Sequence, residues 1–420
     1  MKSFKNYPSA LRQDVLQWIK DIGDLDILVG IPAFNNEDTI KNVVETVGQG
    51  LKEFYPDLKT AILVSDGGSL DDTRETAESA RVPEGIHRKV TIYRGTPGKG
   101  TSFRAIFELA SRCKADACAV VDSDLRSIQP DWIYLLTKPI LERQADFVAP
   151  LYARHKYDGT ITNHIVYPIT RALFGKDIRQ PIGGDFGFSG LLATFYAQQD
   201  VWTTDVAKFG IDIWMTISAI AEGYRVMQAH LGAKIHDPKD PAEDLGPMFQ
   251  QVVSTLFYLI GQYESYWKNI HETVTVDVVN DLRETPKIPP VAVTLSKMEH
   301  EFRDGFEYFR PLYETVLSLE NFNRLTKCYE DLKAGKGLTL DADLWSKILY
   351  DFIFTYQSWS RNRRRLVDII TPLYFGRVGT YCREVAEMTN EEAEEVIQQQ
   401  AKIFERNKEY LLEKLEVWES

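Results

Sequence analysis

The chain has 420 residues, of which 44% are hydrophobic and 26% charged, and its formal net charge is −12. This length exceeds the usual size of one hydrophobic core, so we expect a large domain and a smaller one. The acidic balance disfavours nucleic-acid binding over a broad surface. Apolar windows such as residues 252–260 are far shorter than the roughly 20 residues that cross a bilayer, so we expect no membrane span.

The amino terminus and the cysteines favour a cytoplasmic location. Residues 1–5 lead into a polar amphipathic segment and not into the apolar core of a signal peptide. The four cysteines lack metal-ligand spacing and form no obvious disulfide framework. They are Cys113, Cys118, Cys328 and Cys382.

Apolar runs alternate with helical patterns through the first half of the chain. A helix is predicted over residues 8–22. Strands are predicted at residues 26–31, 61–64, 90–93, 117–121 and 147–149, with helices between them at 37–54, 70–80 and 99–112. This order predicts an α/β fold, with a mostly parallel, Rossmann-like sheet and helices on both faces.

The pattern changes near residue 243. Long helical patterns follow, at residues 245–267, 297–319, 341–358 and 390–418. We therefore predict two domains, an α/β domain over residues 1–242 that includes the amino-terminal helix, and a helical region over residues 243–420. The long, aromatic-rich helices favour a homodimer.

The most informative motif is Asp122-Ser123-Asp124, which follows the buried run Ala119–Val121. A parallel strand points its carboxyl end at the ligand crevice of such a fold. Two carboxylates there repel each other unless a cation lies between them. Mg²⁺ or Mn²⁺ meets this need and brings substrate phosphates as further ligands. The motif predicts a metal site for a phosphorylated substrate.

Three other strand ends carry polar or glycine-rich turns. The first strand leads into Pro32-Ala33-Phe34-Asn35-Asn36-Glu37, where a nucleotide enters a doubly wound sheet. The second ends in Asp66-Gly67-Gly68, which suits a base or ribose. Lys99 lies between two glycines at a helix start and suits a diphosphate. The glycine spacing of a dinucleotide fingerprint or a P-loop is lacking, so a dehydrogenase or an ATPase is not supported.

In this order, the four strand ends resemble those of the GT-A-fold glycosyltransferases, which use a nucleotide-diphospho-sugar and an Asp-x-Asp metal motif. The resemblance covers roughly residues 26–238. It implies that Pro32, Ala33, Phe34, Glu37, Asp66, Gly67, Lys99, Asp122 and Ser123 bind the donor.

Residues 180–186, 209–213 and 234–236 narrow the resemblance to retaining enzymes of the mannosylglycerate, glucosylglycerate and glycosyl-3-phosphoglycerate synthase group. The resemblance implies that Asp124 and His236 bind the metal directly. It leaves three roles open for Asp122. This residue either binds the metal together with them, supports the site without touching the metal, or contacts the donor ribose.

The same resemblance assigns the sugar and the catalytic acids. The turn Gly183-Gly184-Asp185 would approach the donor hexose, with Asp185 available to a sugar hydroxyl. Asp212 would lie near the anomeric carbon, where it either orients the acceptor or stabilises an oxocarbenium-like transition state. These two carboxylates are the predicted catalytic residues.

The acceptor segment maps to residues 158–162, with Arg154 nearby. Gly159, Thr160 and Thr162 stand before a predicted helix, where backbone N–H groups suit a carboxylate. The phosphoglycerate enzymes tend to carry arginine at the position of Thr160. Its absence favours free glycerate or a similar hydroxy acid, although Arg154 and Lys156 weaken that inference. The expected product is a glycosylglycerate made from GDP-mannose or UDP-glucose.

Three alternatives stay open at this point. One is a glycosyl-3-phosphoglycerate synthase, and a second is an inverting, family-2-like glycosyltransferase with another acceptor. The third is a non-catalytic nucleotide-sugar sensor. The basic cluster Arg361–Arg365 is interpreted as a solvated helix face.

Overall fold

The computed structural model describes residues 7–235, 246–280, 288–359 and 362–419. The chain divides into two compact units. The sheet unit comprises residues 1–153, 178–237 and 276–288, and the helical unit comprises residues 154–177, 238–275 and 289–420. The predicted boundary at residue 242 lies outside the described residues. Residues 154–177, placed in the first domain by the prediction, belong to the helical unit.

An eight-stranded sheet forms the centre of the sheet unit, in the order β10-β8-β5-β7-β4-β1-β2-β3. Its pairings are parallel except those of β7, which runs antiparallel to β4 and β5. The prediction of a mostly parallel sheet is confirmed. The strands are β1 Ile27–Ala33, β2 Thr60–Asp66, β3 His87–Ile92, β4 Ala117–Val120, β5 Phe147–Ala153, β7 Phe186–Ser189, β8 Val226–Ala233 and β10 Val278–Val279.

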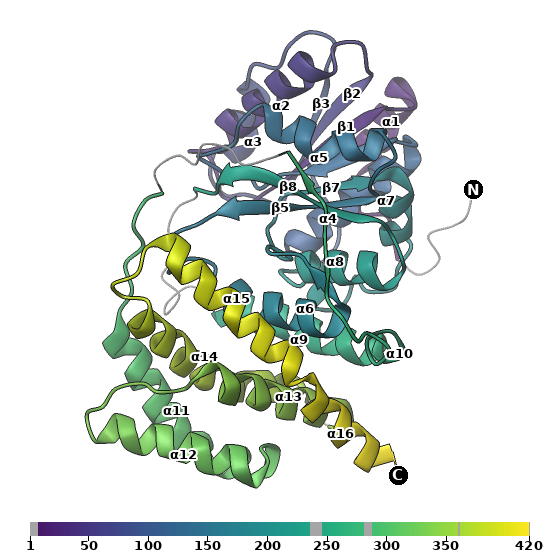
Figure 1. Ribbon diagram of the computed structural model, residues 1–420. Coiled ribbons are helices and arrows are strands. Elements are labelled where there is room, and N and C mark those ends of the chain that lie inside the picture. Colours follow the sequence, from purple (N-terminus) through teal and green to yellow (C-terminus); the bar gives the residue numbers. More distant parts are fainter. Residues whose placement is uncertain (1–6, 236–245, 281–287, 360–361, 420) are drawn as a thin grey trace. The chain divides into compact units, whose positions relative to one another are not determined.

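Helices cover both faces of this sheet (Figure 1). The helices α2 and α5 pack on one face, and α4 packs on the other together with α7 and α8. Every residue of β1 and β2 is buried, as apolar strands between two helical layers require. The helices of this unit are α1 Gln13–Ile22, α2 Ile40–Phe54, α3 Thr73–Ser79, α4 Lys99–Arg112, α5 Asp131–Leu141, α7 Gly190–Ala197 and α8 Ile211–Ala221, with a 3₁₀ turn at Asp205–Ala207.

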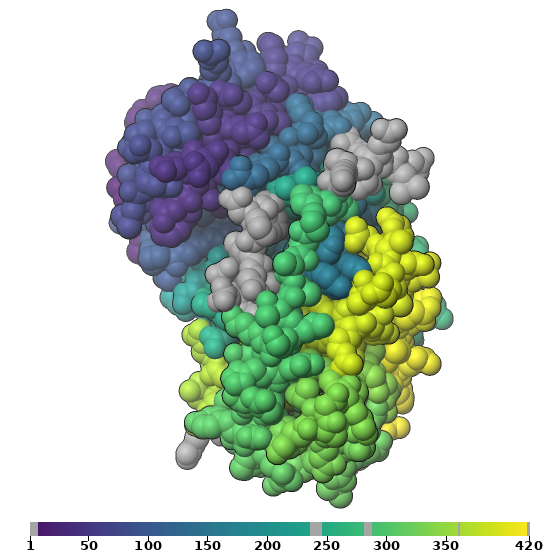
Figure 2. Space-filling view, turned by 90° about the vertical axis from the view of Figure 1, so that its left-hand side faces the viewer, coloured from purple at the N-terminus to yellow at the C-terminus, as the bar shows by residue number. Residues whose placement is uncertain are grey.

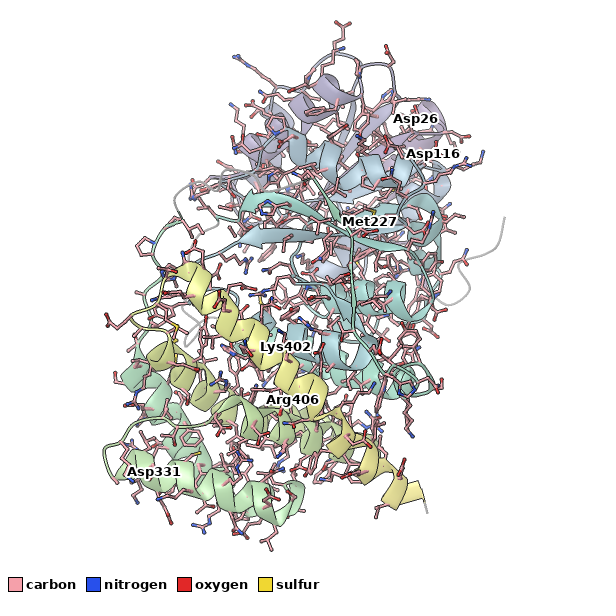
Figure 3. The ribbon with its side chains drawn as sticks, in the orientation of Figure 1. Asp26, Asp116, Met227, Asp331, Lys402 and Arg406 are labelled. Atoms are coloured by element: carbon pink, nitrogen blue, oxygen red, sulfur yellow. The ribbon has the colours of Figure 1, made fainter. Side chains whose placement is uncertain are left out.

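Polar groups at the amino ends of the strands accept hydrogen bonds from backbone N–H groups. Asp26 and Asp116 precede β1 and β4 (Figure 3). The Asp26 carboxylate accepts the N–H of Lys59 at 2.7 Å, and the Asp116 carbonyl accepts the N–H of Gly190 at 3.2 Å. These bonds hold the strands in register at the edge opposite to the polar strand ends.

The helical unit confirms the predicted helical region. Its helix α11 packs mainly along α14, and α11 and α12 form a continuous surface, drawn in green in Figure 2. The elements are a π-helix at Thr162–Val166, α6 Tyr167–Phe174, β6 Lys176–Asp177, α9 Gly246–Gln262, α10 Glu264–Trp267, β9 Val274–Thr275, α11 Leu295–Val316, α12 Leu319–Lys333, α13 Ala342–Ser358, α14 Arg364–Glu384, α15 Asn390–Arg406 and α16 Lys408–Glu419.

The helix α15 shows how the sequence pattern determines these helices. Its buried apolar residues recur at helical spacing, at Ala393, Ile397, Ala401 and Phe404. Lys402 and Arg406 lie on its exposed face (Figure 3). A capping box between Thr389 and Glu392 begins the helix.

The predicted ranges differ from the structure in several places, and the strands β7 and β8 and the helix α12 were not predicted. The helix predicted at 245–267 is two helices, α9 and α10, and that at 390–418 is α15 followed by α16. The helix α14 was not predicted, because Gly376 and Gly379 interrupt its apolar pattern. Arg361 lies outside the described residues, whereas Arg363, Arg364 and Arg365 are exposed, as predicted for a solvated helix face.

Candidate active site

Five charged side chains meet where the parallel strands of the sheet unit end. Asp122 follows β4, Lys234 follows β8, and Lys99 begins α4. Asp212 lies in the first turn of α8. Asp185 precedes β7, and because β7 is antiparallel, its amino end lies at the same sheet edge as the carboxyl ends of its neighbours. We call these five residues the charge chain.

Lys99 joins two carboxylates of the charge chain. Its Nζ lies 2.9 Å from Asp122 Oδ1 and 3.1 Å from Asp212 Oδ2. Burial alone would lower the pKa of Lys99, but the two carboxylates outweigh it and raise that pKa above its ordinary value. Lys99 is therefore a permanent cation at this edge of the sheet.

Lys234 joins the other side of Asp122 to Asp185. Its Nζ lies 2.7 Å from Asp122 Oδ2, 2.9 Å from Asp185 Oδ2 and 2.8 Å from the Gly183 carbonyl. The Asp122 N–H donates to Asp185 Oδ1 at 2.7 Å, and the Tyr152 hydroxyl donates to Asp185 Oδ2. These bonds hold the Gly183-Gly184 turn against the strand end that carries Asp122.

The turn requires glycine at position 184. Gly184 has a φ of +87°, which favours glycine, and a Cβ there would collide with Asp122 Oδ2. The predicted sugar-binding turn Gly183-Gly184-Asp185 and the predicted donor residues Asp122 and Lys99 thus lie together in the sheet unit.

The three carboxylates differ in their electrostatics. Burial raises the pKa of Asp122, but Lys234 and Lys99 outweigh it and hold that pKa below the ordinary value. Burial raises the pKa of Asp185, with Lys234 opposing and Asp122 adding to the shift. Burial also raises the pKa of Asp212, with Lys99 opposing it. Asp122 therefore carries a fixed charge, whereas Asp185 and Asp212 hold a proton more readily.

Asp212 has an open hydrogen-bonding position. The residue is 8% exposed, and its Oδ1 has no hydrogen-bond partner within the described part of the chain. A buried carboxylate oxygen without a partner is costly, so such positions are rare away from functional sites. Asp212 can accept a hydrogen bond from a substrate hydroxyl or face a developing positive charge.

The turns after β1 and β2 are tied to each other. The Glu37 N–H donates to Asp71 Oδ2 at 3.2 Å, and the Glu37 carboxylate accepts the N–H of Asp72 at 2.9 Å. The Asn36 N–H donates to Thr73 Oγ1 at 2.7 Å. Asp71 also accepts the N–H of Thr73 at the start of α3. The predicted donor residues Pro32 and Ala33 are buried at the end of β1.

Asp66 is bound within its own turn. It is buried and accepts the N–H groups of Gly68 at 2.8 Å and Ser69 at 3.0 Å. Phe34, in contrast, is 58% exposed and lies against Gly67, where an added Cβ would meet the phenyl ring. Among the aromatic side chains of these turns, Phe34 presents an exposed ring face.

The predicted metal ligands are only partly described. Asp124 is half-buried. Within the described residues, its carboxylate accepts no hydrogen bond and forms no ion pair. His236 lies outside the described residues. The intervening Ser123 donates to Asn36 Oδ1 at 2.7 Å, and its carbonyl accepts the Thr39 hydroxyl at 2.8 Å. Within the described residues, no cluster of three or more His, Cys, Asp or Glu side chains could hold a metal.

The predicted acceptor residues Arg154, Gly159, Thr160 and Thr162 belong to the helical unit. Arg154 pairs with Asp158 at 3.6 Å. Thr160 and Thr162 are buried, and the Thr160 hydroxyl shares a 2.5 Å hydrogen bond with the Tyr374 hydroxyl. The acceptor role of these residues stays a prediction.

Lys234 and Tyr152 were missed as site residues. Lys234 stands two residues before the predicted metal ligand His236. The strand β8, which ends directly before Lys234, was not predicted, so the position of Lys234 at a strand end was not evident. Tyr152 lies inside β5, which continues past the predicted end at residue 149. The apolar run that continues through Pro150 and Leu151 was the signal that could have extended β5 to Tyr152.

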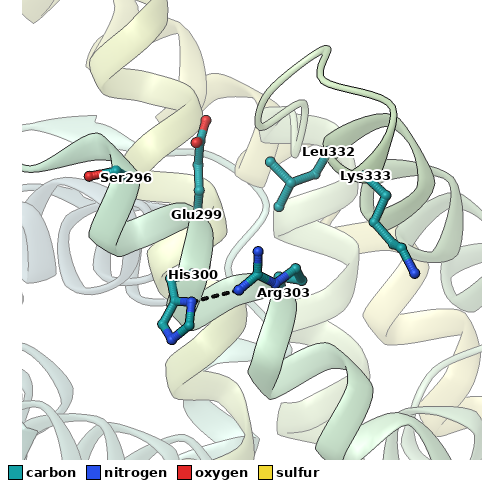
Figure 4. A pocket seen from close by; sticks show the side chains of 6 residues that line it. All are labelled: Ser296, Glu299, His300, Arg303, Leu332 and Lys333. Atoms are coloured by element: carbon teal, nitrogen blue, oxygen red, sulfur yellow. Dashed lines mark hydrogen bonds between the residues drawn. The ribbon is translucent and has the colours of Figure 1, made fainter.

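A pocket of about 450 Å³ lies in the helical unit between α11 and α12 (Figure 4). Arg303 and His300 are hydrogen bonded to each other at 2.6 Å, and His300 also pairs with Asp304 at 3.0 Å. The two side chains best suited to chemistry, Arg303 and His300, are thus already paired, so we do not assign the pocket a catalytic role. It is lined by Ser296, Glu299, His300, Arg303, Leu332 and Lys333.

Comparison with known proteins identifies the chemistry. Residues 28–193 match the model of glycosyl transferase family 2. A relative, the glucosyl-3-phosphoglycerate synthase of Mycolicibacterium smegmatis (strain ATCC 700084 / mc(2)155), is 26% identical over 259 residues, which are 57% of this chain and 79% of the relative. None of the described helices combines the length and the apolar character of a membrane span.

Two solved structures are also similar. One is glucosyl-3-phosphoglycerate synthase from Mycobacterium tuberculosis in complex with Mn²⁺, UDP and phosphoglyceric acid, at 23% identity, 61% of this chain, 85% of that chain and a TM-score of 0.45. The other is described as a mycobacterial protein, at 26% identity, 61% of this chain, 80% of that chain and a TM-score of 0.45. Because both TM-scores lie below 0.5, the assignment rests on the sequence matches. These sequence matches make the chain a nucleotide-sugar glycosyltransferase, in which residues 28–193 are similar to glycosyl transferase family 2.

Proposed function

We propose that the protein transfers a hexose, with retention of the anomeric configuration, from a nucleotide-diphospho-sugar to a hydroxyl group of glycerate or a similar small hydroxy acid. The observation that carries this proposal is the charge chain, in which a fixed cation at Lys99 stands beside the partly unpaired carboxylate of Asp212. The Lys99 cation can stabilise the negative charge of a leaving diphosphate. The Asp212 carboxylate can accept a hydrogen bond from a hydroxyl of the sugar or of the acceptor.

The residues present fit a divalent metal ion. Asp124 offers an open carboxylate, whereas both Asp122 oxygens are paired with lysines. Mg²⁺ and Mn²⁺ sites of this kind use one or two carboxylates and complete their shell with substrate phosphates. Asp124 would hold the ion, with His236 as the further ligand that the family resemblance implies. When bound, the ion would neutralise charge on the diphosphate.

The reaction needs positioning more than a strong base. The bond between the anomeric carbon and the diphosphate oxygen breaks, and its electron pair leaves with the phosphate. The acceptor oxygen forms the new bond on the face that the diphosphate vacates, and its proton passes to the departing phosphate. Lys99 stabilises the charge on that phosphate, and Asp185 orients the hexose.

The donor proposals follow from the two tied turns. Phe34 offers a face on which a base can stack, and the backbone of the turns is preorganised by the bonds from Glu37. GDP-mannose and UDP-glucose are the two donors we propose to test. The relative from Mycolicibacterium smegmatis is named a glucosyl-3-phosphoglycerate synthase, which supports glucose as the transferred hexose.

Phosphoglycerate is the second candidate acceptor, because the curated relative is a glucosyl-3-phosphoglycerate synthase. Against it stands Lys156, whose ammonium donates to three backbone carbonyls and has no donor left for a phosphate. We therefore place free glycerate first.

A screen of both donors against both acids tests this choice. The full-length protein is incubated with Mg²⁺ or Mn²⁺, and products are identified by mass. We expect a hexosylglycerate that requires the metal. Reaction of 3-phosphoglycerate with inert glycerate would overturn the acceptor, and no product from either acid would overturn the proposed function.

A further inference from the structure

The segment of residues 154–163, here called the acceptor loop, is bonded at several points to the carboxy-terminal helices of the same unit. It contains the predicted acceptor residues Arg154, Gly159 and Thr160, and it leads from β5 into the π-helix. Its residues 154–159 are half-buried, so part of their surface is open to a ligand. Hydrogen bonds from the helices of this unit hold the loop in one conformation.

Lys156 is its strongest attachment. Its Nζ donates to the carbonyls of Val385 at 2.8 Å, Ala386 at 2.8 Å and Met388 at 2.7 Å. Its backbone N–H donates to Asn390 Oδ1 at 2.9 Å. One side chain thus satisfies three carbonyls in the turn between α14 and α15, and it also uses all three donors of its ammonium group.

Two tyrosines of α14 bind the same loop. The Tyr381 hydroxyl donates to the Lys156 carbonyl at 3.1 Å, and the Tyr374 hydroxyl shares its hydrogen bond with Thr160. Both tyrosines are 1% exposed. These hydrogen bonds are shielded from water, so each resists the replacement of its partner by solvent.

The end of the loop is held by α15, and the residue that follows it is held by α13. Gln400 donates from Nε2 to the Asn163 carbonyl at 2.8 Å, and Trp345 donates from Nε1 to the His164 carbonyl at 2.7 Å. Three helices distant in sequence therefore fix both ends and the middle of one short segment.

We propose that α13, α14 and α15 form a scaffold that holds the acceptor loop ready for the hydroxy acid, with Lys156 as its main positioning residue. This inference rests on the proposed function, and it gives the helical unit a role in acceptor binding. A loop ordered before binding loses less conformational entropy when the acceptor arrives, so the scaffold lowers the acceptor KM. Lys156 acts through the loop and does not itself touch the acceptor.

The test compares the full-length wild type with Lys156→Met and Tyr381→Phe. Lys333→Met is the matched control, because Lys333 lines the pocket between α11 and α12 (Figure 4). Its ammonium is 4.0 Å from the carboxylate of Glu307. Hydrogen exchange of the peptide covering residues 155–163 measures the order of the loop. Acceptor KM, donor KM and acceptor-free donor hydrolysis measure function, with glycerate and 3-phosphoglycerate as probes.

We expect loop exchange to quicken and acceptor KM to rise about tenfold in Lys156→Met. We expect smaller changes of the same sign in Tyr381→Phe, partial recovery in Lys156→Arg, and no change in the control. Donor KM and donor hydrolysis stay at wild-type values. A global loss of structure would change all peptides and all constants, whereas the scaffold changes only those of the loop and acceptor.

Unchanged loop exchange, or an unchanged acceptor KM in a loosened loop, would overturn the inference. Failure of the proposed function gives a different result, because the wild type itself would then transfer hexose to neither acid. Loop exchange would still decide whether Lys156 orders the segment.

Discussion

Two buried charged clusters, one in each unit, show how similar residues serve different purposes. In the helical unit, Asp351 is fully buried and accepts from Lys414, from the Tyr410 hydroxyl at 2.6 Å, from the Ser318 N–H at 3.0 Å and from Asn321 Nδ2 at 2.7 Å. One carboxylate meets one ammonium, and both of its oxygens are satisfied. This cluster ties α12, α13 and α16 together.

The charge chain of the sheet unit is neither neutral nor saturated. Three carboxylates share two ammonium groups, and Asp212 Oδ1 lacks a partner within the described residues. Excess negative charge and an open acceptor at the carboxyl ends of strands suit a cation and a substrate. The Asp351 cluster, whose carboxylate oxygens all have partners, therefore stabilises the fold. The charge chain, whose carboxylates are incompletely paired, is suited to bind ligands.

Replacement of Lys99 should have the largest effect on activity. Lys99→Met removes the cation beside the leaving diphosphate and leaves Asp122 facing Asp212. We expect kcat/KM to fall about a thousandfold, measured by initial rates with saturating metal. Lys114→Met is the control, since Lys114 forms an exposed pair with Asp24 at 2.9 Å. A fall of less than tenfold would show that Lys99 does not stabilise the leaving group.

Replacement of Asp351 should have the opposite profile. Asp351→Asn leaves Lys414 without its carboxylate, and we expect a loss of about 3 kcal/mol in the free energy of unfolding. The control is Asp331→Asn at the surface (Figure 3), for which we expect a loss within about 1 kcal/mol. Urea unfolding measures both losses. If Asp351→Asn also lowered kcat in the folded protein, the two clusters would not be separable.

The pH dependence sharpens the contrast within the charge chain. The pKa of Asp122 is lowered, so its charge stabilises the fold above its ordinary pKa, and that contribution fades as pH falls. The pKa values of Asp185 and Asp212 are raised by burial, so their protonation favours the fold as pH falls. Because Asp212 must be ionised to act, we expect the acidic limb of kcat/KM to lie above pH 3.8, the ordinary value, while circular dichroism stays native. Simultaneous loss of activity and structure would contradict this order.

Phe34 should show the smallest effect. Phe34→Ala removes the proposed stacking face, and we expect donor KM to rise about fivefold with an unchanged melting temperature. Leu70→Ala is the control in the neighbouring turn, because Leu70 is 92% exposed and only its backbone N–H is bonded, to Asn35. An equal effect of both substitutions would place the base elsewhere.

The sequence predicted those parts of the site that follow buried, apolar parallel strands. The ends of β1, β2 and β4 were found because their apolar runs are followed at once by polar turns. The glycosyltransferase prediction is confirmed by the family match.

Other parts could not be read from the pattern. The strand β8 contains Gln228, His230 and Gly232 and lacks a continuous apolar run, so the position of Lys234 was hidden. The role of β7 depends on its antiparallel pairing, which brings Asp185 to the sheet edge and has no local signal. Attachments such as Lys156 to the end of α14 join segments more than two hundred residues apart, beyond the reach of local periodicity.

The most direct test of the central claim is the anomeric configuration of the product, measured by ¹H NMR on material made from an α-linked donor and glycerate. We predict an α-linked hexosylglycerate, formed only with Mg²⁺ or Mn²⁺ and absent with Asp124→Asn. A β-linked product would contradict the proposed retaining transfer.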